Sequence, residues 1–144
     1  MDLLSESAAE ADRGPTRVTV RSGVTFLVVQ TNAVREHLAA IIDQQLKGME
    51  GHTGGRVALC LSEVDDMNSA FINVLIEADR RFRERGGRLV LFGLNPELSR
   101  LFRDTGLDKR LSVSADCNRA VKRIKRLESP RRRQLWTWFT RQAA

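Results

Sequence analysis

The chain has 144 residues, of which 42% are hydrophobic and 29% are charged, and its formal net charge is +6. That length suits one domain, and the two cysteines, Cys60 and Cys117, are too few for a disulfide framework, so free thiols are expected. The positive charge is concentrated at one end, because from Arg119 onward nine Lys or Arg accompany one Glu, a net charge of +8. Residues 1–118 therefore carry a net charge of −2, which argues against a nucleic-acid-binding surface on this part of the chain.

Residues 1–16 predict a flexible leader. They are rich in Ser, Ala, Glu and Asp, and Gly14-Pro15 closes the segment, a composition that buries too little apolar surface to become ordered. The segment lacks the basic start and apolar core of a secretory signal, and no apolar run in the sequence approaches the length of a membrane span. We therefore expect a cytoplasmic protein.

The next segment predicts a β-hairpin. Val18 and Val20 alternate with polar neighbours, and Ser22-Gly23 supplies a two-residue turn. Residues 24–29 are denser in apolar and β-branched side chains, so the second strand is expected to lie deeper in the sheet.

A helix is expected after the hairpin. Thr31 or Asn32 can cap it, and its apolar side chains keep to one side. The glycine-rich residues 48–55 then predict a link that follows the helix. The apolar positions are Val34, Leu38, Ile41, Ile42 and Leu46.

The centre of the chain predicts a buried strand followed by a helix. Residues 57–61 (Val-Ala-Leu-Cys-Leu) form a continuous apolar run, which is typical of a strand covered on both faces. An acidic turn, residues 63–66 (Glu-Val-Asp-Asp), follows the strand. Asn68 and Ser69 are then N-cap residue types directly before a helical pattern, and Gly86-Gly87 ends that pattern. The apolar side chains of that pattern recur at spacings of four, three and four: Phe71, Leu75, Ala78 and Phe82.

Another strand and helix follow. Residues 88–94 predict a further buried strand, and Asn95 with Pro96 predicts the capped start of a short helix. This helix is expected to run to Gly106.

The last elements complete an alternation of strands and helices. Leu111 and Val113 indicate a short edge strand, and Asp116 is expected to cap a final helix. The order of the elements predicts an α/β fold, with a mixed, largely parallel sheet of four to five strands and about four helices packed on it. The side chains expected to face inward from the final helix are Ala120, Val121, Ile124 and Leu127.

The strand, acidic turn, serine-started helix and Gly-Gly turn resemble the centre of a STAS domain, the module of anti-sigma factor antagonists and of sulfate-transporter tails. In that family the helix opens Asp-Ser-Ser/Thr-Gly-Leu, and residues 68–72 here read Asn-Ser-Ala-Phe-Ile. The resemblance covers about residues 17–127 and implies the STAS fold for them. Further matches are residues 85–91 (Arg-Gly-Gly-Arg-Leu-Val-Leu), Asn95-Pro96-Glu97, Leu101-Phe102 and residues 105–109 (Thr-Gly-Leu-Asp-Lys).

The resemblance also implies a function. In the antagonists the serine after the aspartate is the phosphoacceptor, which makes Ser69 the expected phosphoacceptor here. The unmodified protein would capture a serine kinase that is also an anti-sigma factor, and so free a sigma factor; the kinase would then modify the serine and a phosphatase would restore it. The protein itself would catalyse nothing and use no cofactor. The expected partner-binding residues are Asp65, Asp66, Asn68, Ser69, Ala70, Phe71 and Asn73.

Two residues of this helix start depart from the family pattern, because Asn68 replaces the aspartate and Phe71 replaces the glycine. An amide still caps a helix, yet it lacks the charge that could position the serine for a kinase. Phe71 is expected in the core, which the helical period favours, or as an exposed anchor beside Ser69. The alternative function is a STAS scaffold or sensor module without serine phosphorylation, tethered by its tail to a membrane or a larger complex.

The sequence shows no pattern of catalytic or metal-binding residues. His37 and His52 lack the spacing of zinc ligands, and Glu63, Asp65 and Asp66 lack the spacing and glycine of a calcium loop. Phosphate-binding loops and nucleophile elbows are also missing from the sequence. We therefore expect neither a metal site nor an enzyme.

Residues 128–144 form a basic and aromatic C-terminal tail. Dense aromatic side chains favour burial, so the tail is expected to pack on the domain or on a second copy of the chain, as in a homodimer. A partner protein or a membrane surface is the next alternative, and a nucleic acid is disfavoured. The residues expected to make the tail's contacts are Arg131, Arg132, Arg133, Trp136, Trp138 and Phe139.

Overall fold

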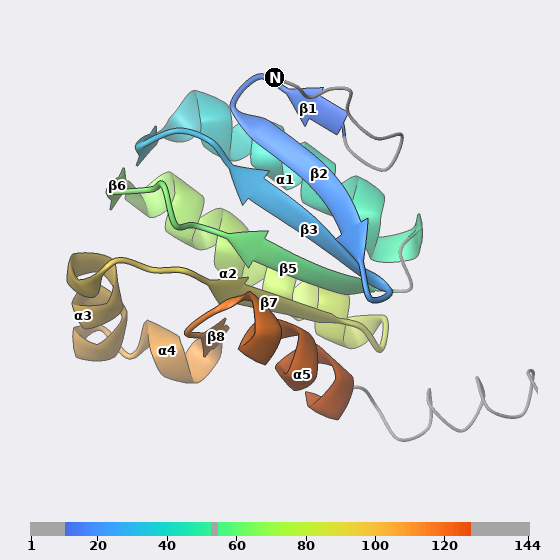
Figure 1. The fold of residues 1–144 in the computed structure, drawn as a ribbon. Coiled ribbons are helices and arrows are strands. Elements are labelled where there is room, and N and C mark those ends of the chain that lie inside the picture. The colour runs from blue at the N-terminus through green and yellow to red at the C-terminus, as the bar shows by residue number, and fades with distance from the viewer. Residues whose placement is uncertain (1–10, 53–54, 128–144) are drawn as a thin grey trace, which may run out of the picture.

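A six-stranded sheet with helices on both faces organises residues 11–52 and 55–127, the part of the chain that this computed structural model describes (Figure 1). A separate two-stranded parallel pair joins β4 (Ala33–Val34) to β6 (Asp66–Met67). From one edge to the other, the strands of the main sheet are β1 (Ala11–Arg13), β2 (Thr16–Arg21), β3 (Val24–Val29), β5 (Arg56–Cys60), β7 (Arg88–Phe92) and β8 (Ser112–Ser114).

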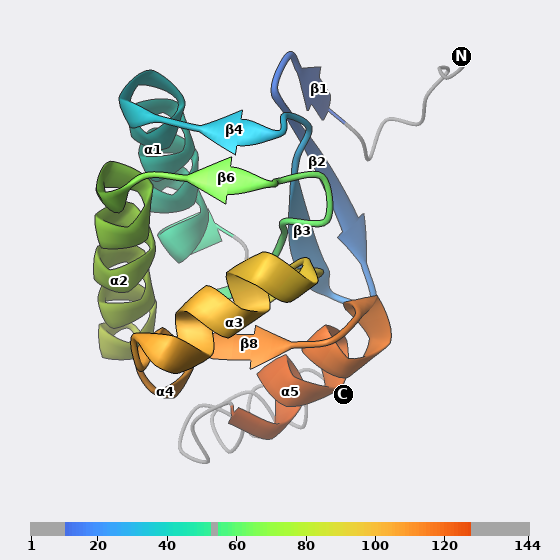
Figure 2. The same ribbon diagram turned by 90° about the vertical axis from the view of Figure 1, so that its left-hand side faces the viewer.

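Two layers of helices cover the sheet. Four of the described helices pack on one face and α5 packs on the other, so the sheet is the middle layer (Figures 1 and 2). The helices are α1 (Glu36–His52), α2 (Ser69–Glu84), α3 (Pro96–Asp104), α4 (Leu107–Arg110) and α5 (Cys117–Leu127).

The central strand β5 contributes side chains to both cores. Val57 and Leu59 belong to the larger core beneath α1 and α2, whereas Ala58 and Cys60 belong to the smaller core beneath α5. Successive side chains of a strand point to opposite faces, so a strand covered on both sides must be apolar throughout. The continuous apolar run therefore predicted the central strand correctly.

The pairing of the strands confirms a mixed, largely parallel sheet. β2 and β3 form the predicted antiparallel hairpin, with Ser22 and Gly23 at φ of 57° and 77°, the positive values that a two-residue turn of type I′ requires. β3, β5, β7 and β8 are then parallel in succession. The structure adds the strand β1, the β4–β6 pair and the short helix α4 to the elements that the sequence predicted.

The prediction of a flexible leader over residues 1–16 needs a correction. Ala11–Arg13 form β1, antiparallel to β2, and the N–H of Gln30 donates to the carbonyl oxygen of Pro15 at 2.6 Å. Main-chain hydrogen bonds are available to any sequence, so a polar segment can become ordered at the edge of a sheet. Residues 1–10 lie outside the described part of the chain.

Helix α1 begins and ends later than the sequence predicted. Val34 lies in β4, so neither Thr31 nor Asn32 caps the helix, whose first residue is Glu36. At its other end the helix continues through Gly48, where the sequence predicted a link. The buried residues that follow, Met49 and Glu50, contribute to the packing against α2 and outweigh the low helix propensity of glycine.

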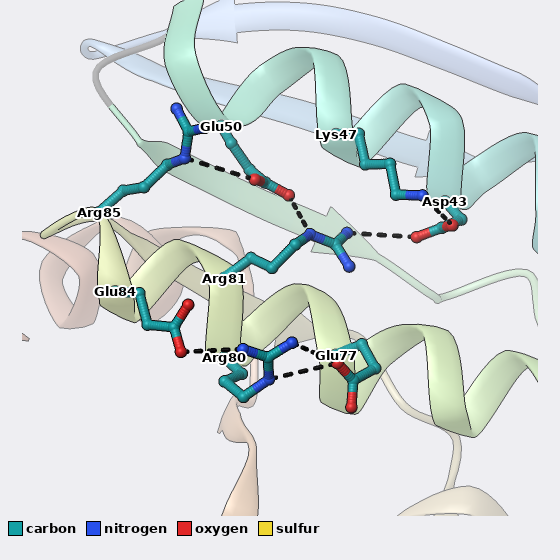
Figure 3. A network of polar contacts seen from close by, with 8 residues as sticks. All are labelled: Asp43, Lys47, Glu50, Glu77, Arg80, Arg81, Glu84 and Arg85. Atoms are coloured by element: carbon teal, nitrogen blue, oxygen red, sulfur yellow. Dashed lines mark hydrogen bonds and ion pairs between the residues drawn. The ribbon is translucent and has the colours of Figure 1, made fainter.

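A network of ion pairs joins α1 to α2 (Figure 3). The Nε atom of Arg81 lies 2.5 Å from Oε2 of Glu50, and its Nη2 atom lies 3.2 Å from Oδ1 of Asp43. The Glu50 side chain is only 7% exposed, so loss of Arg81 would leave a buried carboxylate without a close partner. Burial opposes the charge of Arg81, but its hydrogen bonds and attraction to Glu50 and Asp43 prevail and raise the pKa of the guanidinium.

Replacing Gly48 with alanine tests the corrected boundary of α1. A Cβ at this position would meet nothing within 4 Å, and alanine loses less backbone entropy in a helix. Gly48→Ala should raise the free energy of unfolding by about 0.5–1 kcal/mol in urea denaturation. A neutral or destabilising result would indicate that the helix ends before residue 48.

Gly87→Ala is the matched control for that measurement. A Cβ at Gly87 would lie 2.5 Å from the carbonyl oxygen and 2.7 Å from the Cα of Gly55, and backbone atoms cannot move aside cheaply. The same type of substitution should therefore lower the free energy of unfolding by about 1–3 kcal/mol.

Asp79 on α2 is a buried carboxylate with incomplete pairing. It is 5% exposed, its Oδ2 atom lies 3.0 Å from Nε of Arg83, and its Oδ1 atom has no hydrogen-bond partner. Burial raises the pKa of Asp79, although the charges of Arg83 and Arg88 act in the opposite direction.

A raised pKa predicts the sign of the pH dependence that Asp79 contributes. The Asp79 carboxyl group holds its proton more tightly in the folded state than in the unfolded chain. The stability that the protonated Asp79 contributes is therefore present below the unfolded pKa and is lost as pH rises through the folded pKa. The free energy of unfolding of Asp79→Asn, relative to wild type, should therefore increase with pH from the unfolded pKa of about 3.9 upward. Asp104→Asn, at an exposed position on α3, is the control. A relative stability that falls with pH would show that the ion pair with Arg83 outweighs burial.

Candidate functional site

Two short strands hold the acidic turn and the start of α2 (Figure 2). The carbonyl oxygen of Asn32 accepts hydrogen bonds from the N–H groups of Asp65 at 2.8 Å and Asp66 at 3.0 Å. The carbonyl oxygen of Val34 accepts one from the N–H of Asn68 at 3.2 Å. The turn is thus positioned by its backbone, and the side chains of Asp65 and Asp66 remain exposed.

Asn68 is the N-cap residue of α2. Its backbone is extended, with φ of −96° and ψ of 178°, and its side-chain oxygen accepts a hydrogen bond from the N–H of Phe71 at 3.2 Å. Ser69 is the first residue of the helix and is exposed. Because Asn68 provides the cap, the Ser69 hydroxyl is not required for it. That hydroxyl lies at a helix N-terminus, where unpaired N–H groups and the helix dipole favour an anion.

Phe71 is fully buried in the core beneath α1 and α2. The expectation that the helical period places it inward is confirmed, and the alternative of an exposed anchor is wrong. Its side chain cannot contact a partner directly, so its inclusion among the expected partner-binding residues is corrected. Successive helix positions are rotated by about 100°, so residues two positions away from Phe71 face the opposite side. Ser69 and Asn73 are accordingly exposed.

The turn that leads to Ser69 carries three carboxylates. Glu63, Asp65 and Asp66 are all exposed. The Nη2 atom of Arg35 lies 3.6 Å from Oδ2 of Asp66, with the two side chains 73% and 66% exposed. A solvent-exposed pair of this kind contributes about 0–1 kcal/mol, and one guanidinium does not balance three carboxylates. The turn before Ser69 therefore carries a net negative charge.

The structure gives the expected partner-binding residues different exposures. Asp65, Asp66, Ser69 and Asn73 are exposed, and Asn68 and Ala70 are half-buried. The contributions of Asn32, Val34 and Arg35 were not predicted, because the sequence pattern of this segment favours the start of a helix. A strand of two residues has no periodicity to reveal it, so no sequence signal was available.

The described residues contain no group of three or more His, Cys, Asp and Glu side chains that could hold a metal ion. Cys60 and Cys117 are free thiols, as expected. No helix in the described part of the chain is both long enough and apolar enough to span a membrane. The predicted tail residues lie outside the described part of the chain, so their contacts stay predictions: Arg131, Arg132, Arg133, Trp136, Trp138 and Phe139.

The sequence and the fold agree with a known family. A family model described as "Mlab, STAS domain" matches residues 16–114, which is more than half of the chain. The chain belongs to the STAS domain family.

Individual relatives are similar to parts of this chain. The anti-sigma-B factor antagonist of Listeria monocytogenes serovar 1/2a is 42% identical over 53 residues, which are 37% of this chain and 46% of the relative. The same figures hold for the anti-sigma-B factor antagonist of Listeria innocua serovar 6a. The chain thus spans about half the length of the curated relatives it matches.

Solved structures share the fold at low sequence identity. An anti-sigma-factor antagonist (STAS) domain protein from Planctomyces limnophilus has a TM-score of 0.67 at 21% identity, over 76% of this chain and 97% of that one. The Bacillus cell fate determinant SpoIIAA, solved in its phosphorylated form, has a TM-score of 0.56 at 14% identity, over 76% of this chain and 98% of that one. These similarities confirm the predicted STAS fold.

Substitution of Asn68 tests which side chain caps α2. Asn68→Ala should lower the free energy of unfolding by about 1 kcal/mol, because an N–H of the first turn loses its acceptor, whereas Asn68→Asp should keep the cap. Ser69→Ala is the control and should change stability by less than about 0.5 kcal/mol. Denaturant titration of the three variants measures these differences. If Ser69→Ala cost as much as Asn68→Ala, the serine would be the capping residue.

Proposed function

We propose that this STAS domain acts as an anti-sigma factor antagonist through a phosphorylation switch at Ser69. The unmodified surface binds a serine kinase that is also an anti-sigma factor, and phosphorylation of Ser69 releases it until a serine phosphatase removes the phosphate. The observation that carries this proposal is the exposure of Ser69 at the first residue of a helix that Asn68 caps. The Listeria antagonists and the phosphorylated form of SpoIIAA support it.

Phosphate at Ser69 is compatible with the fold. A helix N-terminus offers N–H groups and the positive end of the dipole to an anion, and Ser69 makes no contribution to the cap that modification would remove. The core contact of the first turn comes from Phe71, which faces away from the serine. The domain therefore keeps its shape in both states.

The change falls on the surface that a partner would contact. A phosphoserine adds about −1.5 to −2 charges at neutral pH. Glu63, Asp65 and Asp66 already make this surface negative, so a partner packed here would face repulsion and the cost of desolvating a dianion. Loss of binding follows from charge, without a change of fold.

The proposed protein is a binding module without an enzymatic activity of its own, acting in the cytoplasm. Partner contacts come from the exposed side chains of Asp65, Asp66, Ser69 and Asn73, with Asn68 and Ala70 at the edge of the contact. Phe71 supports this surface from beneath.

One observation favours a second candidate function. Asn68 stands where the family pattern has an aspartate, and its amide is engaged in capping rather than in carrying a charge beside the serine. A site without that carboxylate suits a STAS scaffold or sensor module whose serine stays unmodified.

Incubation with candidate kinases separates these two functions. Each serine kinase of the anti-sigma class from the source organism is incubated with the protein and ATP, and the phosphate is mapped by mass spectrometry. We expect modification at Ser69 and none in Ser69→Ala. Phosphate on another residue, or none with any kinase, would favour the scaffold.

Binding of the same kinase to charge variants tests the sign of the switch. Ser69→Ala should bind like the wild type, and Ser69→Asp should bind at least about tenfold more weakly, a difference of about 1.4 kcal/mol. Asn118→Asp adds the same charge at an exposed position of α5, on the other face of the sheet, and should leave affinity unchanged. Equal binding by Ser69→Asp and wild type would count against the switch.

A further inference from the structure

A basic groove lies between β8 and α5, on the face of the sheet opposite α1 and α2. Its volume is about 360 Å³, and its lining includes the side chains of Ser114, Arg119, Lys122, Arg123 and Arg126. No carboxylate is among the residues that line it. A second cavity of about 370 Å³ shares Arg123 and Val113 with the groove.

The packing of α5 explains why the cations gather on one side. Ala120 and Ile124 are fully buried against the sheet. Arg119, Lys122 and Arg126 follow at spacings of three and four residues, so they share one exposed face of the helix. With a rise of about 1.5 Å per residue, they extend along about 10 Å.

Arg123 closes the groove on the side of the sheet. Its Nη1 atom donates a hydrogen bond to the carbonyl oxygen of Val113 at 2.8 Å, which occupies an acceptor on the edge strand β8. Its Nε atom is buried and has no hydrogen-bond partner. Arg123 therefore holds a fixed position and keeps one N–H unpaired at the boundary of the two cavities.

Little negative charge compensates these residues. The Nε atom of Arg119 lies 3.8 Å from Oδ2 of Asp116, and both side chains are more than half exposed, so this ion pair is weak. Among the described residues, no carboxylate lies within ion-pair distance of Lys122 or Arg126. Asp108 lines the second cavity, where its Oδ1 atom also lacks a hydrogen-bond partner. The groove thus carries three guanidinium groups and one ammonium group around a hollow.

We propose that this groove binds a small soluble ligand that bears two or more phosphate groups. Guanidinium groups present planar sets of N–H donors that match phosphate oxygens, and the hollow is of the size that small-molecule sites have. Several cations along about 10 Å suit a ligand with more than one phosphate, because a single phosphate would reach only part of them.

The described residues disfavour a membrane surface and a nucleic acid as the occupant. A helix that binds a membrane needs apolar side chains beside its cations, but Ala120 and Ile124 are buried in the core. Sites for single-stranded nucleic acids commonly combine cations with aromatic side chains on which bases stack, and none lines the groove. Residues 128–144 carry a net positive charge themselves, so they do not complement the groove.

Titration of the full chain with inorganic pyrophosphate tests the proposal. We expect saturable one-to-one binding, with changes in the amide NMR signals of residues 113–126. Lys122→Gln combined with Arg126→Gln should weaken binding at least tenfold while the thermal unfolding temperature stays close to that of the wild type. The control combines Lys47→Gln with Arg80→Gln, which removes the same charge from α1 and α2 and should change affinity less than twofold.

Several results would overturn the proposal. An equal loss in the control pair would show diffuse attraction to net charge, and a loss caused only by replacing Arg131, Arg132 and Arg133 with glutamine would place binding in the tail. Binding to phosphatidylglycerol vesicles or to a single-stranded oligonucleotide that pyrophosphate fails to displace would identify a different class of occupant. Absence of saturation with pyrophosphate would exclude the site.

Discussion

The burial of Phe71 is the constraint on which the candidate site depends. Phe71 lies in the core, and the helical rotation of about 100° per residue then turns Ser69, two positions earlier, toward solvent. Asn68 reinforces this arrangement because its side chain caps the N–H of Phe71 itself. Phe71, which differs from the family pattern, therefore sets the orientation of Ser69, which matches it.

The surrounding elements hold α2 at both ends. At its start, the β4–β6 pair fixes the acidic turn through main-chain hydrogen bonds that leave the carboxylates exposed. Toward its end, Arg81 and Arg85 contact the nearly buried Glu50 of α1 (Figure 3). The removal of one partner from such a pair would leave an uncompensated buried charge, so the contact between the two helices depends on both partners. The start of α2 is thus positioned by the β4–β6 pair, and its end is joined to α1 by ion pairs.

The acidic turn before α2 and the basic groove beside α5 are separate surfaces of the domain. The acidic turn precedes α2, which packs on one face, whereas the cations of α5 lie over the other. The net charge of the whole chain hides this separation, because it adds the acidic and basic surfaces together. The two proposed kinds of binding would therefore use separate surfaces of one small domain. Added negative charge would disrupt the proposed partner binding, whereas the proposed groove ligand is itself an anion.

The sequence by itself determined the alternation of strands and helices, the central position of β5 and the inward face of α2, because burial on one or both faces imposes a pattern on neighbouring residues. Tertiary structure alone decided where α1 begins and ends, that Val34 pairs in a strand, and that Ala11–Arg13 join the sheet. The convergence of Arg123 with Arg119, Lys122 and Arg126 around a groove was also decided there. The boundaries of α1 and the pairing of Val34 rest on contacts with residues distant in the chain, and such contacts leave no local periodicity in the sequence. β1 rests on main-chain pairing with β2, and the groove rests on the packing of α5 beside β8.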